Sequence, residues 1–168
     1  NQGGLTSSKP YVVVNYNPVP NTTSGTIQVN DDTVYRLKNV GSGKYMSVHN
    51  GFDNNSINVY QKDDELTSTD YYSQYFLVKY DSEEDACRIQ PICSMYGRRR
   101  VLDIVKSAAG VQGLTHGCNL QTYNPVDDIA ELFKFVPVGG GYYKIVPKYN
   151  ASLAITAYGT GNGSSGGT

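Results

Sequence analysis

Tryptophan is absent from this chain of 168 residues, and cysteine, histidine and methionine are rare. The three cysteines and two histidines show neither the CxxC spacing of a zinc site nor the HExxH pattern of a metalloprotease. No apolar run approaches the ~20 residues that a membrane span requires. We therefore expect no metal, no other cofactor and no insertion into a membrane.

Charge of either sign is also scarce. The chain has 14 basic and 15 acidic residues, and its net charge is −1. A protein that binds nucleic acid through the phosphate backbone needs a basic face to displace counterions, so nucleic acid is not an expected partner. The one basic cluster, Arg98–Arg100, follows a glycine and is interpreted as a solvated turn.

Turn-forming residues and tyrosine are abundant instead, with 18 glycines and 15 tyrosines. Glycine and asparagine favour turns that need a positive φ, and tyrosine suits half-buried strands. No segment sustains the 3.6-residue periodicity of an amphipathic helix. These features predict an all-β protein.

Short alternating segments recur at intervals of about fifty residues, which is the signature of an internal repeat. The expected first strands of the three units are Tyr35–Leu37, Cys87–Ile89 and Tyr143–Ile145, and the expected second strands are Met46–Val48, Leu102–Ile104 and Leu153–Ile155. The first two units also show a third strand, Ile57–Gln61 and Asn119–Tyr123, and a fourth strand, Gln74–Val78 and Glu131–Phe135. Four strands in each of three units predict a β-trefoil.

The third unit ends two strands short in the sequence, and open sheet edges are a liability. Val14–Val19 resembles Gln121–Val126, and Ile27 precedes Tyr35 as Phe135 precedes Tyr143. We therefore hypothesise a circular permutation in which residues 11–30 supply the last two strands of the third unit. A linker followed by a truncated domain is the alternative.

The predicted organisation is a flexible tail followed by one trefoil domain over residues 11–168. The tail covers residues 1–10, and the units cover 31–81, 82–138 and 139–168, with 11–30 as the candidate last strands of the third unit. Cys87 and Cys93 are too far apart in an extended segment to bridge each other. Cys118 could pair with either, but buried free thiols are the preferred interpretation.

Two segments carry a resemblance to a known family. Residues 35–45 (YRLKNVGSGKY) are close to the opening YRIKNVNSGKYL of ricin-B-type lectin domains and family-13-like carbohydrate-binding modules, and residues 138–146 (VGGGYYKIV) are similar to their VGDGYYxIV junction. The hallmark Gln-x-Trp is replaced by Gln74-Tyr75-Phe76 and Glu131-Leu132-Phe133. The resemblance implies the trefoil fold, and we expect phenylalanine to fill the packing role of the tryptophan.

In similar lectins, each sugar site uses an aspartate on the second strand, a glutamine and an aromatic residue on the third, and an Asn-Gln pair before the tryptophan. By this resemblance the second unit retains Asp103, Gln121 and Tyr123, with Ala130-Glu131 in place of the Asn-Gln pair. A carboxylate accepts hydrogen bonds from two sugar hydroxyls, and an aromatic face covers the C–H face of the sugar. Each residue also has a structural alternative, since Asp103 could fix a turn, Gln121 could be an exposed strand residue and Tyr123 could cover the barrel edge.

The other two sites are expected to have lost their sugar-binding residues. The first unit has Ser47, Tyr60 and Lys62 at the three positions, and the third has Ala154 in place of the aspartate. Tyr16 would supply an aromatic ring to the third unit if the permutation holds.

No catalytic pattern is evident, so an enzyme is not expected. The sequence predicts a noncatalytic carbohydrate-binding module of a secreted bacterial multidomain protein, which would bind oligo- or polysaccharide beside neighbouring domains. A protein-interaction or structural trefoil with decayed sugar sites is the alternative, because one fold hosts many functions.

Overall fold

The computed structural model describes residues 11–15, 21–23, 26–28, 34–65, 71–95 and 97–168. Within these ranges the chain contains β-strands and short 3₁₀ helices but no α-helix. No helix in this part of the chain is long and apolar enough to cross a membrane. The architecture therefore rests on strand pairing.

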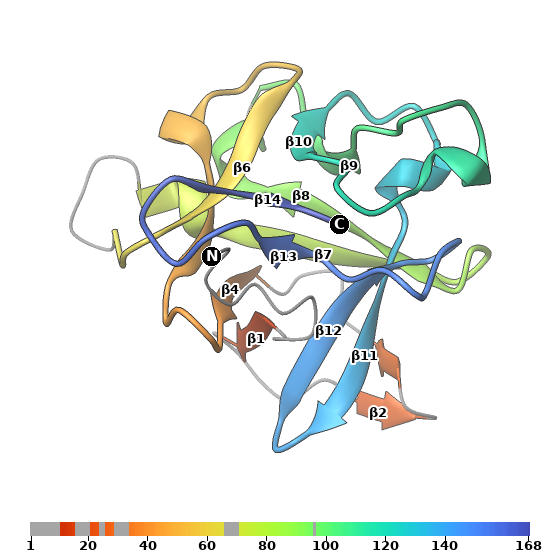
Figure 1. The fold of residues 1–168 in the computed structure, drawn as a ribbon, viewed down its shortest axis with the longest axis horizontal. Helices are drawn as coiled ribbons and strands as arrows, with labels where there is room; N and C mark the ends of the chain where they lie inside the picture. The colour runs from red at the N-terminus through yellow and green to blue at the C-terminus, as the bar shows by residue number, and fades with distance from the viewer. Residues whose placement is uncertain (1–10, 16–20, 24–25, 29–33, 66–70, 96) are drawn as a thin grey trace.

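A closed barrel of six strands forms one layer (Figure 1). Its strands, in the order in which they pair, are β4 (Val34–Asn39), β7 (Phe76–Asp81), β8 (Ala86–Pro91), β11 (Phe133–Gly139), β12 (Tyr142–Pro147) and β1 (Tyr11–Asn15). The strand β1 pairs antiparallel with both β12 and β4, so it closes the barrel. Closure leaves no unpaired sheet edge in this layer.

Three hairpins form the second layer, one from each unit. They are β5 (Tyr45–Val48) with β6 (Ile57–Lys62), β9 (Val101–Ile104) with β10 (Leu120–Tyr123), and β13 (Thr156–Ala157) with β14 (Ser164–Gly167). The strand β6 pairs with both β10 and β14, and an isolated bridge joins Asn119 to Gly167. A six-stranded barrel with three joined hairpins is a β-trefoil, which confirms the predicted fold.

The third unit differs from the expectation in where its strands come from. Tyr11–Asn15 takes the fourth place in the barrel, so the N-terminal segment does complete the third unit, but it supplies one strand rather than two because the third strand is Ser164–Gly167. The segment around Ile27 instead forms a separate two-stranded sheet of β2 (Asn21–Thr23) and β3 (Thr26–Gln28). The second strand is Thr156–Ala157 rather than Leu153–Ile155. Pairing with neighbouring strands, of β14 with β6 and β13 and of β1 with β12 and β4, decides these strands rather than their own β-propensity.

The core lies between the barrel and the hairpins and is built from equivalent residues of each unit. Phe76 and Phe133, at the positions of the family's tryptophan, are both completely buried within it. Burial of a phenylalanine side chain stabilises a fold by about 1.5 to 3 kcal/mol. The packing role expected for these two residues is therefore confirmed.

The three cysteines are free thiols. Cys87 and Cys118 are buried and Cys93 is half-buried. Burial raises the pKa of Cys93 to about 11. No cysteine bridges the units, so hydrophobic packing and strand pairing hold the trefoil together.

Five 3₁₀ helices connect the strands in the described part of the chain. They are η1 (His49–Gly51), η2 (Tyr71–Gln74), η3 (Ile92–Ser94), η4 (Val111–Gly113) and η5 (Ile129–Glu131). Two of them, η2 and η5, end on the equivalent residues Gln74 and Glu131. They place these side chains next to the hairpins.

Candidate functional site

Asp103 and Gln121 face each other across the hairpin β9–β10 of the second unit. Their Cα positions are partners in the antiparallel register, and Gln121 Nε2 donates a hydrogen bond of 2.7 Å to Asp103 Oδ1. Tyr123 lies two residues beyond Gln121, and alternation places it on the same face of the strand. Its side chain is half-buried. The structure thus brings three of the sequence-predicted site residues together on one hairpin face.

The opposite face of this hairpin explains the arrangement. Leu102, Ile104, Leu120 and Thr122 are buried beneath it. Because side chains of a strand point alternately to its two faces, burial of these four residues directs Asp103, Gln121 and Tyr123 away from the core. The local hydrophobic pattern therefore fixes the orientation of the candidate site.

Asp103 is held by a side chain rather than by the backbone of a turn. It is 8% exposed, and burial is the main cause that raises the pKa of its carboxyl, with the charge of Asp128 adding to it. The hydrogen bond from Gln121 and the charge of Lys106 act in the opposite direction. Among the residues that the structure describes, Gln121 is the single hydrogen-bond donor to this carboxylate, so Oδ2 keeps its lone pairs for a ligand.

Glu131, the fourth predicted residue, lies beneath the site rather than on its surface. The helix η5 packs against β9, and the side chain of Glu131 is 0% exposed. Its Oε1 accepts a hydrogen bond of 2.9 Å from the backbone N–H of Val126, while its Oε2 has no hydrogen-bond partner in the described part of the chain. Burial and then the charge of Asp103 raise the pKa of this carboxyl, whereas the Val126 N–H and Arg88 lower it.

Gln74 occupies the equivalent place in the first unit, and its side chain makes three hydrogen bonds. Its Oε1 accepts from Glu65 N at 3.1 Å and from Arg36 Nη2 at 2.6 Å, and its Nε2 donates to Asp63 O at 2.7 Å. Both Gln74 and Glu131 therefore anchor the backbone of the preceding loop through Oε1. The second unit differs because an acidic oxygen replaces the amide N–H₂ group.

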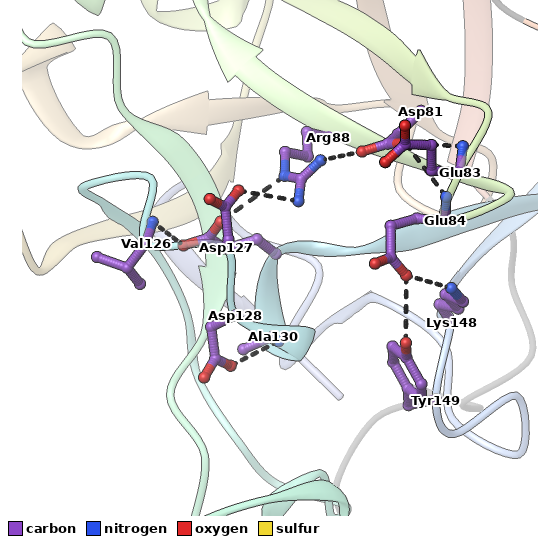
Figure 2. Close-up of polar contacts among 11 residues, drawn as sticks. Asp81, Glu83, Glu84, Arg88, Val126, Asp127, Asp128, Ala130, Lys148 and Tyr149 are labelled. Carbon is purple, nitrogen blue, oxygen red and sulfur yellow. Dashed lines mark hydrogen bonds and ion pairs between the residues drawn. The ribbon is translucent and has the colours of Figure 1, made fainter.

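The loop before Glu131 is held by charged side chains that the sequence analysis did not identify. Figure 2 shows Arg88 between Asp81, at 2.5 Å, and Asp127, at 3.2 Å. Arg88 Nε lies 3.9 Å from Glu131 Oε2, which is beyond hydrogen-bonding distance. These contacts join β8 to the loop that carries Glu131.

Asp128 and Lys106 complete this set of charged groups. Asp128 Oδ1 accepts a hydrogen bond from Ala130 N at 2.9 Å and thereby caps η5, and both of its carboxylate oxygens lie 2.7 Å from Lys106 Nζ. Lys106 follows Asp103 by three residues, and no sequence pattern would have paired it with Asp128. The lysine links the loop after β9 to η5.

The equivalent site of the first unit is filled by the protein's own side chains. Ser47, at the aspartate position, lies 2.9 Å from Ser73 Oγ, which donates to Glu65 Oε2 at 3.1 Å. All three side chains are buried, and Lys62 forms an ion pair with Glu65. Tyr60 is buried as well. The one carboxylate of this hydrogen-bonded chain, Glu65, is bonded to Ser73 and paired with Lys62.

The third unit offers no equivalent carboxylate among its described residues. Ala154 takes the aspartate position, as expected from the sequence. The strand that pairs with β13 consists of serine and glycine, so it carries no aromatic ring. Tyr16, the candidate ring for this unit, lies outside the described residues.

Arg100 corrects the interpretation of the basic cluster. Arg98 and Arg99 are exposed, but Arg100 is 1% exposed and is among the largest fully buried side chains. Its guanidinium donates to the side chains of Asn55 and Asn124, and its Nε lies 3.5 Å from Asp53 Oδ1. Arg100 therefore joins the first and second units instead of facing solvent.

Comparisons with solved structures support the fold. The chain is similar to ThreeFoil, a designed 3-fold symmetric protein, with a TM-score of 0.65 and 20% identity over 80% of this chain and 86% of that chain. It is also similar to an exo-β-1,3-galactanase from Clostridium thermocellum, with a TM-score of 0.66 and 25% identity over 83% of this chain and 28% of that chain. No family model and no curated protein matches the sequence. The chain thus shares a trefoil fold with one protein of similar length and with about a quarter of a larger enzyme.

Proposed function

We propose that this chain is a noncatalytic carbohydrate-binding module and that its second unit holds the sugar. The observation that carries the proposal is the shared face of Asp103, Gln121 and Tyr123, where a carboxylate whose Oδ2 has no partner among the described residues lies beside an amide and a half-buried ring. The carboxylate and the amide accept and donate hydrogen bonds to sugar hydroxyls, and the ring covers a C–H face. This is the set of residues that the ricin-B resemblance assigns to sugar binding.

The similarity to part of a galactanase supports the proposal that this chain belongs to a larger protein. The chain corresponds to 28% of that enzyme, which is named for its action on a galactan. We propose accordingly that this module belongs to a larger secreted bacterial protein and brings its neighbours to a polysaccharide. A single site made of solvated polar contacts is expected to bind weakly, with a Kd of about 1 mM. Adjacent modules would raise the effective affinity.

A glycan array and polysaccharide pull-down with the purified chain tests the proposal. The variants Asp103→Ala and Tyr123→Ala are expected to abolish binding, while the matched control Tyr142→Ala, on the exposed part of β12, is expected to retain it. Circular dichroism would show that each variant is folded. Equal binding by all variants would disprove the assignment to the second unit.

One observation favours a second function, a trefoil that binds protein or serves as a structural domain. The first-unit site is closed by the chain Ser47–Ser73–Glu65, and the third has no carboxylate in its described part. A folded protein that binds no glycan in the array would support this alternative.

A further inference from the structure

Acidic groups outnumber basic groups around the candidate site of the second unit. In the described part of the chain, Asp103 and Glu131 interact electrostatically with one another and with two further carboxylates and two cations. The two further carboxylates are Asp127 and Asp128, and the two cations are Arg88 and Lys106. A ligand at this site therefore enters a negative potential.

Glu131 contributes to this potential from a buried position. Its side chain is 0% exposed, and among the described residues its Oε2 has no hydrogen-bond partner and the nearest cationic atom is Arg88 Nε at 3.9 Å. Arg88 is also shared with Asp81 and Asp127. The first unit has the neutral amide of Gln74 at the same place. A carboxyl group at this position thus distinguishes the second unit from the first, and its recorded cationic neighbour lies beyond hydrogen-bonding distance.

Asp103 is the member of this acidic group that a ligand at the candidate site would contact. It lies on β9, against which η5 with Glu131 packs; its Oδ1 is bonded to Gln121, and its Oδ2 has no partner among the described residues. An ammonium group brings three donors and a positive charge to such an oxygen. Charge-assisted hydrogen bonds are about twice as strong as neutral ones, whereas a sugar carboxylate or sulfate would be repelled.

We propose that the second-unit site selects sugars with a free amino group, of the glucosamine type, over N-acetylated, neutral and acidic sugars. This inference rests on the proposed carbohydrate-binding function and names its ligand class. The ammonium donates to Asp103 Oδ2, Gln121 bonds a neighbouring hydroxyl, and Tyr123 covers the ring of the sugar. Glu131 acts on the ligand through Asp103 and does not touch it.

Calorimetric titration with matched oligosaccharides tests the inference. The probes are tetramers of glucosamine, N-acetylglucosamine and glucose and a tetramer of a uronic acid, at pH ~6, below the ~7.7–8.0 at which an α-amino group loses its proton. We expect the Kd for the glucosamine tetramer to be at least tenfold lower than for the others and to rise with salt. In Glu131→Gln the preference should shrink, and in Asp103→Asn it should disappear. The exposed control Glu83→Gln should leave it unchanged.

The outcomes separate the two proposals. If neutral or acidic tetramers bind as tightly as glucosamine, and Asp103→Ala and Tyr123→Ala abolish that binding, the ligand class is wrong while the carbohydrate-binding function stands. If glucosamine binds equally well to Asp103→Asn and Tyr123→Ala, it is attracted only to the general negative surface and the inference is overturned. If no tetramer and no array glycan binds the folded protein, the carbohydrate-binding function itself fails.

Discussion

Replacement of Glu131 by glutamine is expected to stabilise the protein at neutral pH. The side chain is completely buried, and its Oε1 bond to Val126 N is available to either residue. The substitution removes a buried charge that Asp103 repels and puts a neutral amide N–H₂ group in the place of Oε2. A buried group without a partner costs about 1 to 3 kcal/mol and more when it is charged, so loss of the charge is expected to be favourable. Loss of the attraction to Arg88 reduces the gain, so we expect about 1 to 2 kcal/mol at pH 7.

The gain depends on pH in a defined direction. Folding raises the pKa of Glu131 above its ordinary value of 4.5, so the folded state holds this proton more tightly than the unfolded state. The wild-type protein therefore loses stability as the pH rises through 4.5 toward the higher folded-state pKa. Below 4.5 the carboxyl is protonated in both states, and the advantage of Glu131→Gln is expected to fade.

Urea and thermal unfolding, followed by circular dichroism from pH 4 to 8, measure this difference. A gain of 1 to 2 kcal/mol corresponds to a rise in Tm of about 2 to 8 °C for a domain of this size. The matched substitution Gln74→Glu should destabilise the protein at pH 7, because it removes the donor to Asp63 O. If Glu131→Gln lowers the stability at pH 7, Glu131 is an ionised partner of Arg88, and the reasoning is refuted.

Four further substitutions or treatments test other parts of the structure. Arg100→Ala should lower the free energy of unfolding by about 3 kcal/mol, since it leaves buried polar partners unpaired, whereas Arg98→Ala should change it by less than about 0.5 kcal/mol in the same urea titration. Deletion of residues 1–15 should open the barrel between β4 and β12 and yield aggregates in size-exclusion chromatography, and a monomeric folded product would contradict this. Ser47→Asp should cost about 2 to 4 kcal/mol and create no glycan binding, because it buries a carboxylate near another acid. Native Cys93, with its pKa of about 11, should react with a thiol reagent at pH 8 at least about 100-fold more slowly than in the unfolded chain.

Most of the fold could be predicted from the sequence because two units have strong internal patterns. The expected strands around Tyr35, Met46, Cys87 and Leu102 all fall within β4, β5, β8 and β9. In the sequence each of these four segments has a polar residue between two apolar ones (Tyr35-Arg36-Leu37, Met46-Ser47-Val48, Cys87-Arg88-Ile89 and Leu102-Asp103-Ile104), so their own periodicity indicates both strand and core face. The repeat then predicted the trefoil.

The third unit could not be predicted in the same way. Ser164–Gly167 consists of residues that are depleted in strands, and it becomes one through its partners β6 and β13. The place of Tyr11–Asn15 in the barrel likewise depends on β12, which lies far away in the sequence. The similarity of Val14–Val19 to Gln121–Val126 indicates that the N-terminal segment completes the third unit, but it does not give the strand or the register of either pairing.

The candidate site was only partly predictable, for a related reason. Asp103, Gln121 and Tyr123 lie on one hairpin, and strand alternation suffices to bring them together. Glu131, Lys106 and Arg88 come from other elements, and their contacts depend on how η5 packs on β9. The burial of Arg100 follows from the same kind of contact between units, which composition does not reveal.

Closure of the barrel by β1 has a consequence for the order of folding. During synthesis Tyr11–Asn15 leaves the ribosome before all other described strands, but its partner β12 ends at Pro147. The strand β1 can first pair with β4, but it can pair with β12 only after nearly the whole domain has been synthesised. Because a long loop must close before this last contact forms, we expect sealing of the barrel to be a late and slow step. Until then, β1 and β4 would present a strand edge that a nascent neighbour or a chaperone can bind.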